Sequence, residues 1–235
     1  MQRYFAKNLE KNVVTLQDSD LHHIKTVMRM KANDNIEVVY KKDTYLCQIM
    51  SDYKIEILNK LDEDNELKIN IILACALVQE QKLDLIIGKL TELGINTFIP
   101  LKMNRSIVKL DSKKEAKKIE RWTKIAKEAS EQSKRNIIPN ITNIMTIKDL
   151  VKLEATKKIV LSTKEKNNVL NISLQSDTFC DSIIIVTGPE GGITNEEETF
   201  LNQHGFKSVS LGSRILRVET AAIYITSIIN YINMR

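Results

Sequence analysis

The 235-residue sequence predicts an α/β fold in two parts: a small β-rich domain over residues 1–68 and a larger α/β domain over residues 69–235. Two observations lead to this prediction. Short runs rich in β-branched and aromatic residues fill the first part, whereas the second part alternates continuous apolar runs with segments of helical periodicity. An acidic, polar stretch at 62–66, DEDNE, lies between them and is the expected domain boundary.

The first part contains five candidate strands separated by polar turns and one helix. The strands are QRYFA, NVVTL, NIEVVY, TYLCQIM and YKIEILN. Lys41-Lys42-Asp43 and Ser51-Asp52 form polar turns between the last three. Several short strands at this spacing predict a compact barrel or sandwich. The helix is expected to be capped by Asp18 or Ser19 and to carry an apolar stripe of Leu21, Ile24, Val27 and Met28.

The second part opens with a β-α-β unit. KINIILACALV, at 68–78, is continuously apolar, as expected of a strand buried on both faces. A helix follows, with Leu83, Ile86, Ile87 and Leu90 on one face, and it ends at Gly94. The next strand is INTFIPL, so the two strands should be parallel and joined by a right-handed crossover.

A basic helix follows at 113–135, with nine Lys or Arg residues and four Glu residues. Ala116, Ile119, Trp122 and Ala126 are expected on its inner face. Such a segment is typical of a polyanion-binding surface, but it is equally compatible with a solvated lysine-rich face. A short helix at 147–153, the strand KIVLS and the strand SIIIVTG complete a domain of about five or six strands.

Composition limits the classes of protein and of site. An apolar run of the ~20 residues needed to span a bilayer is absent, and the first residues lack the apolar core of a signal peptide. We therefore expect no membrane association and a cytoplasmic location. Cys47, Cys75 and Cys180 are far apart in apolar runs, which favours buried free thiols over a metal or redox site. The adjacent His22 and His23 would diverge by about 100° on a helix, which is poor geometry for a shared metal.

Glycine is rare and concentrated. Four of the seven glycines lie in two short loops near the C-terminal end. The first loop, GPEGG at 188–192, is followed by Thr194 and Glu197, a capping box that begins the next helix. The loop lacks the lysine of a P-loop, and G-x-G-x-x-G is absent from the chain. From the residues alone, this loop could hold an adenosine-type ligand, an anion, or nothing.

The second loop, LGSRILRVETAA at 211–222, enters a helix. Its charged residues Arg214, Arg217 and Glu219 are spaced three and two apart between apolar residues. They could form a functional polar cluster or a structural ion pair. Both loops follow β-type runs, and ligands of open α/β sheets bind beyond the carboxyl ends of the strands.

Together the two loops resemble the SPOUT class of methyltransferases, and in particular the ribosomal RNA small subunit methyltransferase E family. MQRYF, LHHIKTVMRM, KLTELGINTFIP, NRSIVKL and the RW…EASEQSKR helix are similar to that family at the corresponding places. Ile193 stands where the family usually has Phe, and Ser213 where it usually has Pro.

The resemblance implies a SPOUT α/β domain with a trefoil knot, a PUA-like RNA-binding barrel at the N-terminal end, and a homodimer. The implied cofactor is S-adenosylmethionine, and no metal is expected. Three loops would bind the cofactor through Leu161, Ser162, Thr163, Gly188, Pro189, Glu190, Gly191, Gly192, Leu211, Gly212, Ile215, Leu216, Arg217, Glu219, Thr220 and Ala221.

The activity implied is methylation of N3 of a uridine in 16S ribosomal RNA of the small subunit. Because the N3 proton must leave, we expect Glu219 or Glu190 to accept a hydrogen bond or the proton, and Arg217 or Arg214 to stabilise charge on the uracil oxygens. RNA contacts are expected from Arg105, Lys117, Arg121, Lys124, Lys134 and Arg135. Arg105 and Arg135 could instead help to build the donor pocket. The alternatives are a non-catalytic RNA-binding or ribosome assembly factor and a transfer RNA methyltransferase of the same class.

Overall fold

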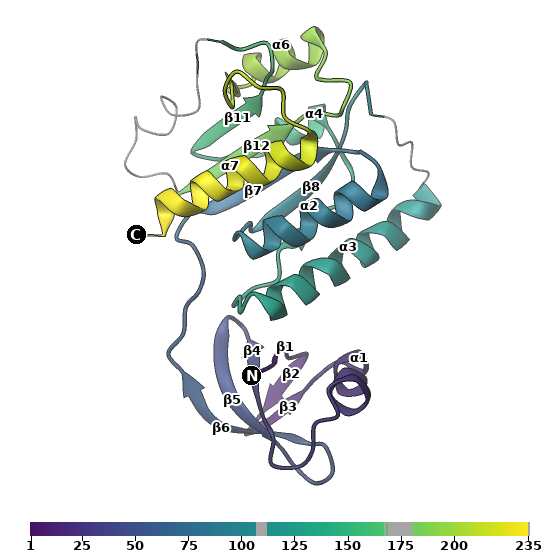
Figure 1. Cartoon of the computed structure of the whole chain (residues 1–235), viewed down its shortest axis with the longest axis vertical. Helices are drawn as coiled ribbons and strands as arrows, with labels where there is room; N and C mark the ends of the chain where they lie inside the picture. The colour runs from purple at the N-terminus through teal and green to yellow at the C-terminus, as the bar shows by residue number, and fades with distance from the viewer. Residues whose placement is uncertain (107–111, 167, 169–180, 235) are drawn as a thin grey trace. The chain divides into compact units, whose positions relative to one another are not determined.

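A computed structural model describes residues 1–106, 112–166, 168 and 181–234 (Figure 1). The chain forms two compact units. Unit 1 consists of Met1–Glu66 and Glu128–Ile138, and unit 2 of Leu67–Lys127 and Pro139–Arg235. Cys180, one of the three cysteines expected to be a buried thiol, lies outside the described residues.

Unit 1 is built on one six-stranded sheet. Its strands are β1 (Arg3–Phe5), β2 (Asn8–Glu10), β3 (Val13–Thr15), β4 (Asn35–Tyr40), β5 (Asp43–Ile49) and β6 (Ile55–Leu61), in the order β1-β4-β5-β6-β3-β2. β1 pairs with β4 in parallel, and the other neighbours are antiparallel. The five expected strands are confirmed. β2 was missed because its sequence, NLE, carries little β propensity.

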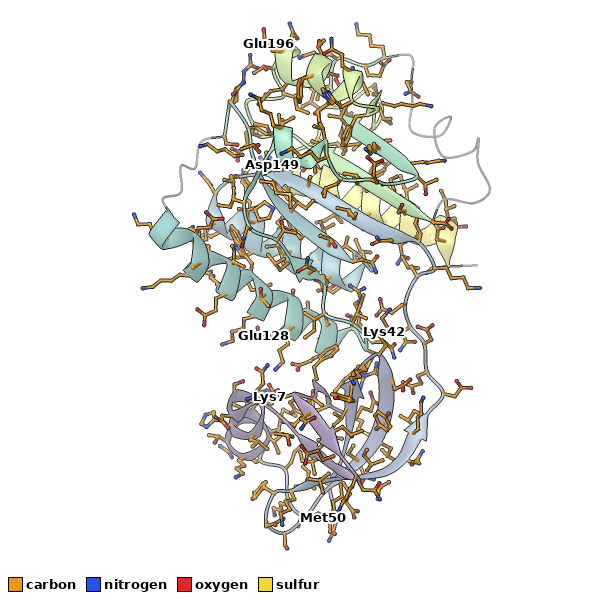
Figure 2. The ribbon with its side chains drawn as sticks, turned by 180° about the vertical axis from the view of Figure 1, so that it is seen from behind. Lys7, Lys42, Met50, Glu128, Asp149 and Glu196 are labelled. Atoms are coloured by element: carbon orange, nitrogen blue, oxygen red, sulfur yellow. The ribbon has the colours of Figure 1, made fainter. Side chains whose placement is uncertain are left out.

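The β4–β5 connection is a two-residue hairpin turn at Lys41-Lys42, with φ of 50° and 76° (Figure 2). Positive φ at both central residues is characteristic of a type I′ turn. Hairpins favour this turn because its twist matches that of the flanking strands. The polar turn expected at this place is confirmed.

The helix of unit 1 differs from the expectation. It begins after Gln17, with no side-chain cap, and runs as α1 (Asp18–His22) before changing to a π-helix, η1 (His23–Val27). The wider π turn interrupts the α-helical periodicity, so the apolar stripe breaks: Ile24 is buried, whereas Val27 is 60% and Met28 38% exposed. His23 Nδ1 lies 3.0 Å from the hydroxyl oxygen of Tyr4. Burial of Tyr4, with smaller effects of the Glu131 and Asp20 charges, raises the pKa of Tyr4 to about 12.

A buried charge cluster holds the two segments of unit 1 together. The Arg3 side chain is fully buried, and its Nε lies 2.9 Å from Glu37 Oε2. Its Nη2 lies 2.6 Å from Glu63 Oε2, and its Nη1 donates to the carbonyl oxygen of Lys134. Lys134 Nζ also reaches Glu37 Oε2, at 2.8 Å. Burial alone would raise the pKa of Glu37, but the hydrogen bonds from Lys134 and Arg3 outweigh it and hold that pKa below its usual range.

Unit 2 contains a parallel sheet of seven strands. They are β7 (Asn70–Ala76), β8 (Thr97–Lys102), β9 (Asn140–Ile141), β10 (Met145–Thr146), β11 (Lys157–Leu161), β12 (Ser182–Thr187) and β13 (Lys207–Val209). The order is β10-β8-β7-β12-β11-β13, with β9 also paired to β8. Consecutive β7 and β8 are parallel neighbours joined by α2 (Glu80–Glu92), so the expected β-α-β unit is confirmed.

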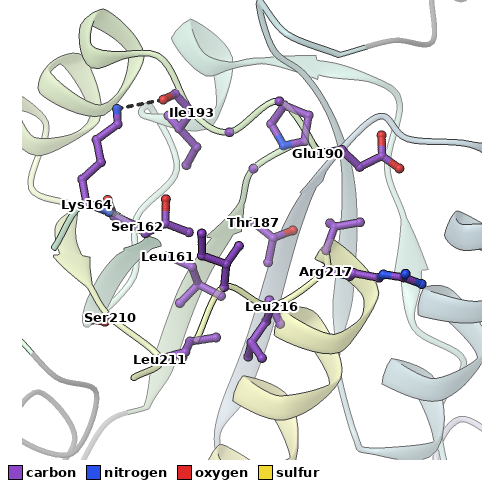
Figure 3. A pocket seen from close by; sticks show the side chains of 18 of the residues that line it. Leu161, Ser162, Lys164, Thr187, Glu190, Ile193, Ser210, Leu211, Leu216 and Arg217 are labelled. Atoms are coloured by element: carbon purple, nitrogen blue, oxygen red, sulfur yellow. Dashed lines mark hydrogen bonds between the residues drawn. The ribbon is translucent and has the colours of Figure 1, made fainter. Parts of the chain in front are cut away.

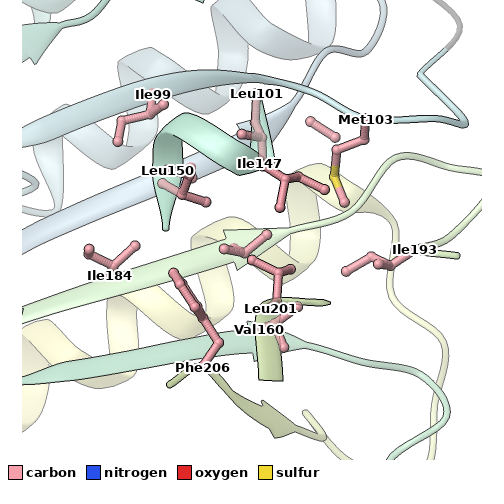
Figure 4. Close-up of a cluster of buried hydrophobic side chains, with 13 residues drawn as sticks. Ile99, Leu101, Met103, Ile147, Leu150, Val160, Ile184, Ile193, Leu201 and Phe206 are labelled. Carbon is pink, nitrogen blue, oxygen red and sulfur yellow. The ribbon is translucent and has the colours of Figure 1, made fainter. Parts of the chain in front are cut away.

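The sheet of unit 2 buries both of its faces. Alternate residues of the central strands, including Ala74, Ile99, Val160 and Ile184, form one apolar cluster (Figure 4). The helices α4 (Ile147–Leu150) and α6 (Asn195–Gln203) contribute Ile147, Leu150 and Leu201 to this cluster. The helix α7 (Val218–Asn233) packs against α2 and against β12. Successive side chains of a strand point to opposite faces of the sheet. A parallel sheet covered on both faces therefore needs apolar residues at every position of its central strands.

Several helix boundaries follow the sequence signals. α2 ends just before Gly94, where φ is +94°, and α6 begins with the capping box of Thr194 and Glu197. α4 is shorter than the expected 147–153 but has a capping box of its own, formed by Thr146 and Asp149.

Burial also agrees with the expectation for two of the cysteines and for part of the basic helix. Cys47 and Cys75 are buried free thiols, and burial raises the pKa of each to about 12. The basic helix is α3 (Ser112–Gln132). Trp122 and Ala126 are buried as expected, whereas Ala116 is exposed.

Candidate active site at the strand ends

A cavity of about 480 Å³ opens at the carboxyl ends of β11, β12 and β13 (Figure 3). Three loops form its walls. We call them loop A (161–164), loop B (187–193) and loop C (210–218). The side chains that line it are mostly aliphatic or hydroxylic, as in pockets of this size that bind small molecules.

Loop B follows β12 directly and is shaped by its glycines. A turn is closed by the Gly192 amide, which donates to the carbonyl oxygen of Pro189 at 2.8 Å, with φ of +74° at Gly192. Ile193 then folds under Gly188: a Cβ on Gly188 would lie 2.5 Å from Ile193 Cγ1. Only glycine fits at position 188 without a shift of backbone or core. The Ile193 side chain is buried in the apolar cluster.

Loop C leaves β13 and enters α7. The Ser210 hydroxyl donates to the Gly212 carbonyl at 3.2 Å, and Gly212 has φ of +111°. Arg217 is the N-cap residue of α7, and Val218 is buried at its first turn. Ile215 lines the cavity and is 85% exposed.

The structure brings the predicted cofactor residues together. All of those named in the sequence analysis line the cavity, except Glu219 and Thr220. Glu219 lies in the first turn of α7, and its Oε2 is buried with no hydrogen-bond partner among the described residues. Thr220 is exposed and does not line the cavity.

The four predicted catalytic side chains differ in how they are engaged. Glu190 forms an ion pair with Lys82 of α2, which occupies its Oε1. Arg214 and Arg217 are exposed and line the cavity. The two candidate acids are Glu190 and Glu219. Of their carboxylate oxygens, only Glu219 Oε2 is buried and without a hydrogen-bond partner among the described residues. Burial is the largest cause of the raised pKa of the Cys75 thiol, and the negative charge of Glu219 also raises this pKa.

The predicted RNA-binding residues separate into two groups. Lys117 and Lys124 are exposed on α3, and Arg121, although half exposed, forms ion pairs with Glu80 and Asp84 of α2. Lys134 and Arg135 belong to unit 1. Lys134 forms an ion pair with Glu37. Arg135, which is only 3% exposed, forms an ion pair with Glu66. Burial in an ion pair gives Arg135 a structural role in unit 1.

Arg105 joins the cavity, in agreement with the alternative role considered for it. Its Nη1 donates to the Gly191 carbonyl at 2.8 Å, and its aliphatic carbons pack against Gly191. The neighbouring amide of Asn104 donates to Glu197 Oε1 at 2.7 Å, so the chain after β8 is held against loop B and α6.

Sequence reasoning missed two charged residues that line the cavity, Lys164 and Glu198. Neither belongs to a glycine-rich motif, and the only signal for Lys164 is that it follows the end of a buried strand. In the described part of the chain, no helix is long and apolar enough to cross a membrane, and no cluster of three His, Cys, Asp or Glu side chains could hold a metal ion.

Comparison with known proteins assigns the family. Residues 65–230 match the RNA methyltransferase domain family, and residues 16–57 match the RNA methyltransferase PUA domain family. Ribosomal RNA small subunit methyltransferase E of Bacillus subtilis is 38% identical, with 98% of this chain and 96% of the relative covered. The chain belongs to the ribosomal RNA small subunit methyltransferase E family. The Mesomycoplasma hyopneumoniae member is 37% identical over 96% of this chain and 97% of its own length.

The fold agrees with this family. The crystal structure of the Neisseria gonorrhoeae methyltransferase E bound to S-adenosyl methionine superposes with a TM-score of 0.86 at 29% identity, with 98% of this chain and 97% of that chain covered. The expected α/β methyltransferase fold, PUA-like domain and enzyme class are thus confirmed. The trefoil knot stays a prediction, because the segment between β11 and β12 includes undescribed residues.

Proposed function

We propose that this methyltransferase transfers the methyl group of S-adenosylmethionine to N3 of a uridine in 16S ribosomal RNA of the small subunit. The observation that carries the proposal is the cavity at the strand ends, built from three loops of a chain that belongs to the methyltransferase E family. The three family members named above are small-subunit ribosomal RNA methyltransferases. The N3 position is our assignment.

The cavity fits an adenosine-type cofactor. Its volume of about 480 Å³ lies within the range of small-molecule pockets. The side chains of Leu161, Leu211 and Leu216 offer an apolar surface for a purine, and the glycines of loop B let a ligand approach backbone amides closely. When bound, S-adenosylmethionine supplies an already activated methyl group on a sulfonium. The work of this chain is therefore to orient the two reactants, which is worth up to ~7–11 kcal/mol in favourable cases.

The uracil N3 carries a proton that must leave before the nitrogen is a good nucleophile. We assign the acceptor role to Glu219, because its buried Oε2 is unpartnered, whereas Glu190 is held by Lys82. Because Glu219 does not line the cavity, it acts either on a uracil ring that reaches the first turn of α7 or on the uracil through a bridging water. Arg217 or Arg214, both exposed at the cavity, stabilises negative charge on the uracil oxygens.

The residue assignment has a direct test in turnover. We expect Glu219→Gln to lower kcat by roughly 100-fold, the size typical of a lost general base, with little change in the affinity for S-adenosylmethionine. Near wild-type turnover of both Glu219→Gln and Arg217→Ala at saturating substrate would remove these residues from the mechanism.

RNA contacts are assigned to Lys117 and Lys124, which are exposed on α3. Lys134 and Arg135 are left out, because the carboxylates of Glu37 and Glu66 engage them within unit 1. Arg121 ranks below Lys117 because two carboxylates already neutralise it.

We also propose a homodimer and a cytoplasmic location, where ribosomal subunits are assembled. Three large apolar side chains on α7 and one at its C-cap are exposed, at 47–64%: Tyr224, Tyr231, Ile232 and Met234. An apolar helix face of this kind is suited to a second copy of the chain.

The decisive test is a map of methylated nucleotides. Small-subunit RNA from a strain lacking this protein should lack one N3-methyluridine, and addition of the purified enzyme with S-adenosylmethionine should restore it. Restoration in transfer RNA instead, or no restoration together with tight RNA binding, would favour the transfer RNA enzyme or the assembly factor, respectively.

A further inference from the structure

Lys164 connects loop A of the cavity to loop B and to α6. Its Nζ donates to the Ile193 carbonyl at 2.9 Å and to Asn195 Oδ1 at 2.7 Å, and it lies 3.4 Å from Glu198 Oε2 (Figure 3). An ammonium group has three donors, and each of them has an acceptor. Two of the three acceptors are neutral, so this is more than an exposed ion pair.

The carbonyl of Ile193 is a sensitive place to hold loop B. It follows Gly192, whose φ is +74°, and precedes the N-cap Thr194 of α6. The Ile193 side chain is fixed in the core beneath Gly188. With Arg105 on the Gly191 carbonyl and Lys164 on the Ile193 carbonyl, two cations from different segments fix the path of one short loop.

The same contact extends to β13, the strand that leads into loop C. Glu198 Oε2 faces Lys164, while Glu198 Oε1 accepts a hydrogen bond of 2.8 Å from the Ser208 hydroxyl in β13. Within loop A itself, the Lys164 amide donates to Ser162 Oγ at 3.2 Å. Lys164 and Glu198 therefore link loop A to loop B and to the strand that precedes loop C through side chains.

We propose that Lys164 is a positioning residue that holds the three loops in the cofactor-binding arrangement before the cofactor arrives. The inference rests on the proposed function for the identity of the cofactor. A pocket that is already ordered loses less conformational freedom on binding, so its affinity is higher. Because the Lys164 ammonium is directed at Ile193, Asn195 and Glu198, we expect its loss to act on the affinity for S-adenosylmethionine and not on the chemical step.

The test compares Lys164→Met with Lys164→Arg and with a control, Lys166→Met, an exposed lysine of the same segment. Calorimetry should show a Kd for S-adenosylmethionine raised roughly 10-fold in Lys164→Met, about the effect of one net hydrogen bond, with kcat at saturation within about twofold of wild type. Lys164→Arg should be intermediate, because a planar guanidinium cannot direct its donors as an ammonium does. Lys166→Met should match wild type.

A second readout needs no cofactor. Amide hydrogen exchange of the cofactor-free protein should accelerate over residues 188–198 in Lys164→Met and stay unchanged in Lys166→Met. Thermal melts check folding, and Lys164→Arg preserves the test should Lys164→Met fail to fold.

The outcomes separate the two proposals. Wild-type affinity and wild-type exchange in Lys164→Met would overturn the role of Lys164, as would a loss confined to kcat. Absence of S-adenosylmethionine binding by the wild-type protein would instead refute the proposed function.

Discussion

The two units use charged side chains in opposite ways. In unit 1, Arg3, Glu37 and Lys134 are brought together in a buried or half-buried cluster that ties distant segments into one body. In unit 2, the sheet core is apolar, and charged groups gather on the loops at the strand ends and on exposed faces of α3. Under the proposed function, exposed basic residues of unit 2 are therefore better candidates for RNA contacts than those held by carboxylates in the cluster of unit 1.

The largest expected effect is the loss of Arg3. Arg3→Met nearly keeps the volume but removes the buried cation from Glu37, which retains Lys134, and from the half-exposed Glu63, so the loss should approach the lower end of the ~3–5 kcal/mol that breaking a buried pair costs. Urea unfolding should therefore show a strongly destabilised unit 1, with Lys54→Met, at an exposed pair with Asp52, as the unchanged control. Equal stability of the two variants would mean that the cluster is not what holds unit 1 together.

A matched substitution in unit 2 should preserve the fold and weaken the binding of S-adenosylmethionine. Gly188→Ala places a Cβ 2.5 Å from Ile193 Cγ1, so loop B must shift. We expect affinity for S-adenosylmethionine to fall at least roughly 10-fold, measured by calorimetry, since one displaced backbone donor or acceptor costs about 1–3 kcal/mol. Gly205→Ala is the control: φ is +87° there, but no atom lies within 4 Å of the added carbon and the residue does not line the cavity. A similar loss in both variants would show that a general loss of stability, and not the shape of loop B, weakens binding.

Acid should affect unit 1 through Glu37. Hydrogen bonds from Lys134 and Arg3 hold the pKa of Glu37 in the folded state below its unfolded value, despite the opposing effect of burial. Glu37 therefore adds stability that is complete above the unfolded pKa and is lost as pH falls through the folded pKa. The protection factors of amides in β4 and β5 should fall below about pH 4.5, the range in which an ordinary glutamate titrates, and Glu37→Gln should weaken this dependence. A pH dependence unchanged in Glu37→Gln would assign the acid sensitivity to other groups.

The smallest expected effect concerns RNA. Removing one phosphate contact with Lys117→Gln should lower the slope of log affinity against log salt by about 0.7–0.9. Arg135→Gln, which breaks the buried pair with Glu66, should destabilise unit 1 while leaving that slope unchanged. A slope lowered by Arg135→Gln and not by Lys117→Gln would reverse the division of basic residues drawn above.

Local patterns in the sequence predict much of this structure. The β-α-β unit, the capping box of Thr194 and Glu197, and the glycine loops are encoded within short stretches, so periodicity and turn chemistry are enough to find them. The π-helical turn that begins at His23 could not be predicted, because one extra residue in a turn leaves no mark in the composition.

The missed side chains depend on contacts far apart in the chain. The partners of Arg3 lie 34, 60 and 131 residues away, and Lys164 meets residues 29 to 34 positions later. Spacing rules within a single helix or strand cannot find such pairs, which appear only when the fold is known. The same reason explains why Arg135 looked available for RNA: its partner Glu66 lies 69 residues before it.

Hydrogen exchange with and without S-adenosylmethionine tests the central claim that three loops of unit 2 form one cofactor site. We expect slower exchange in residues 161–166, 187–193 and 210–218 together when the cofactor is present, and no change in the strands of unit 1. Protection of a single loop, of none, or of unit 1 instead would contradict the claim.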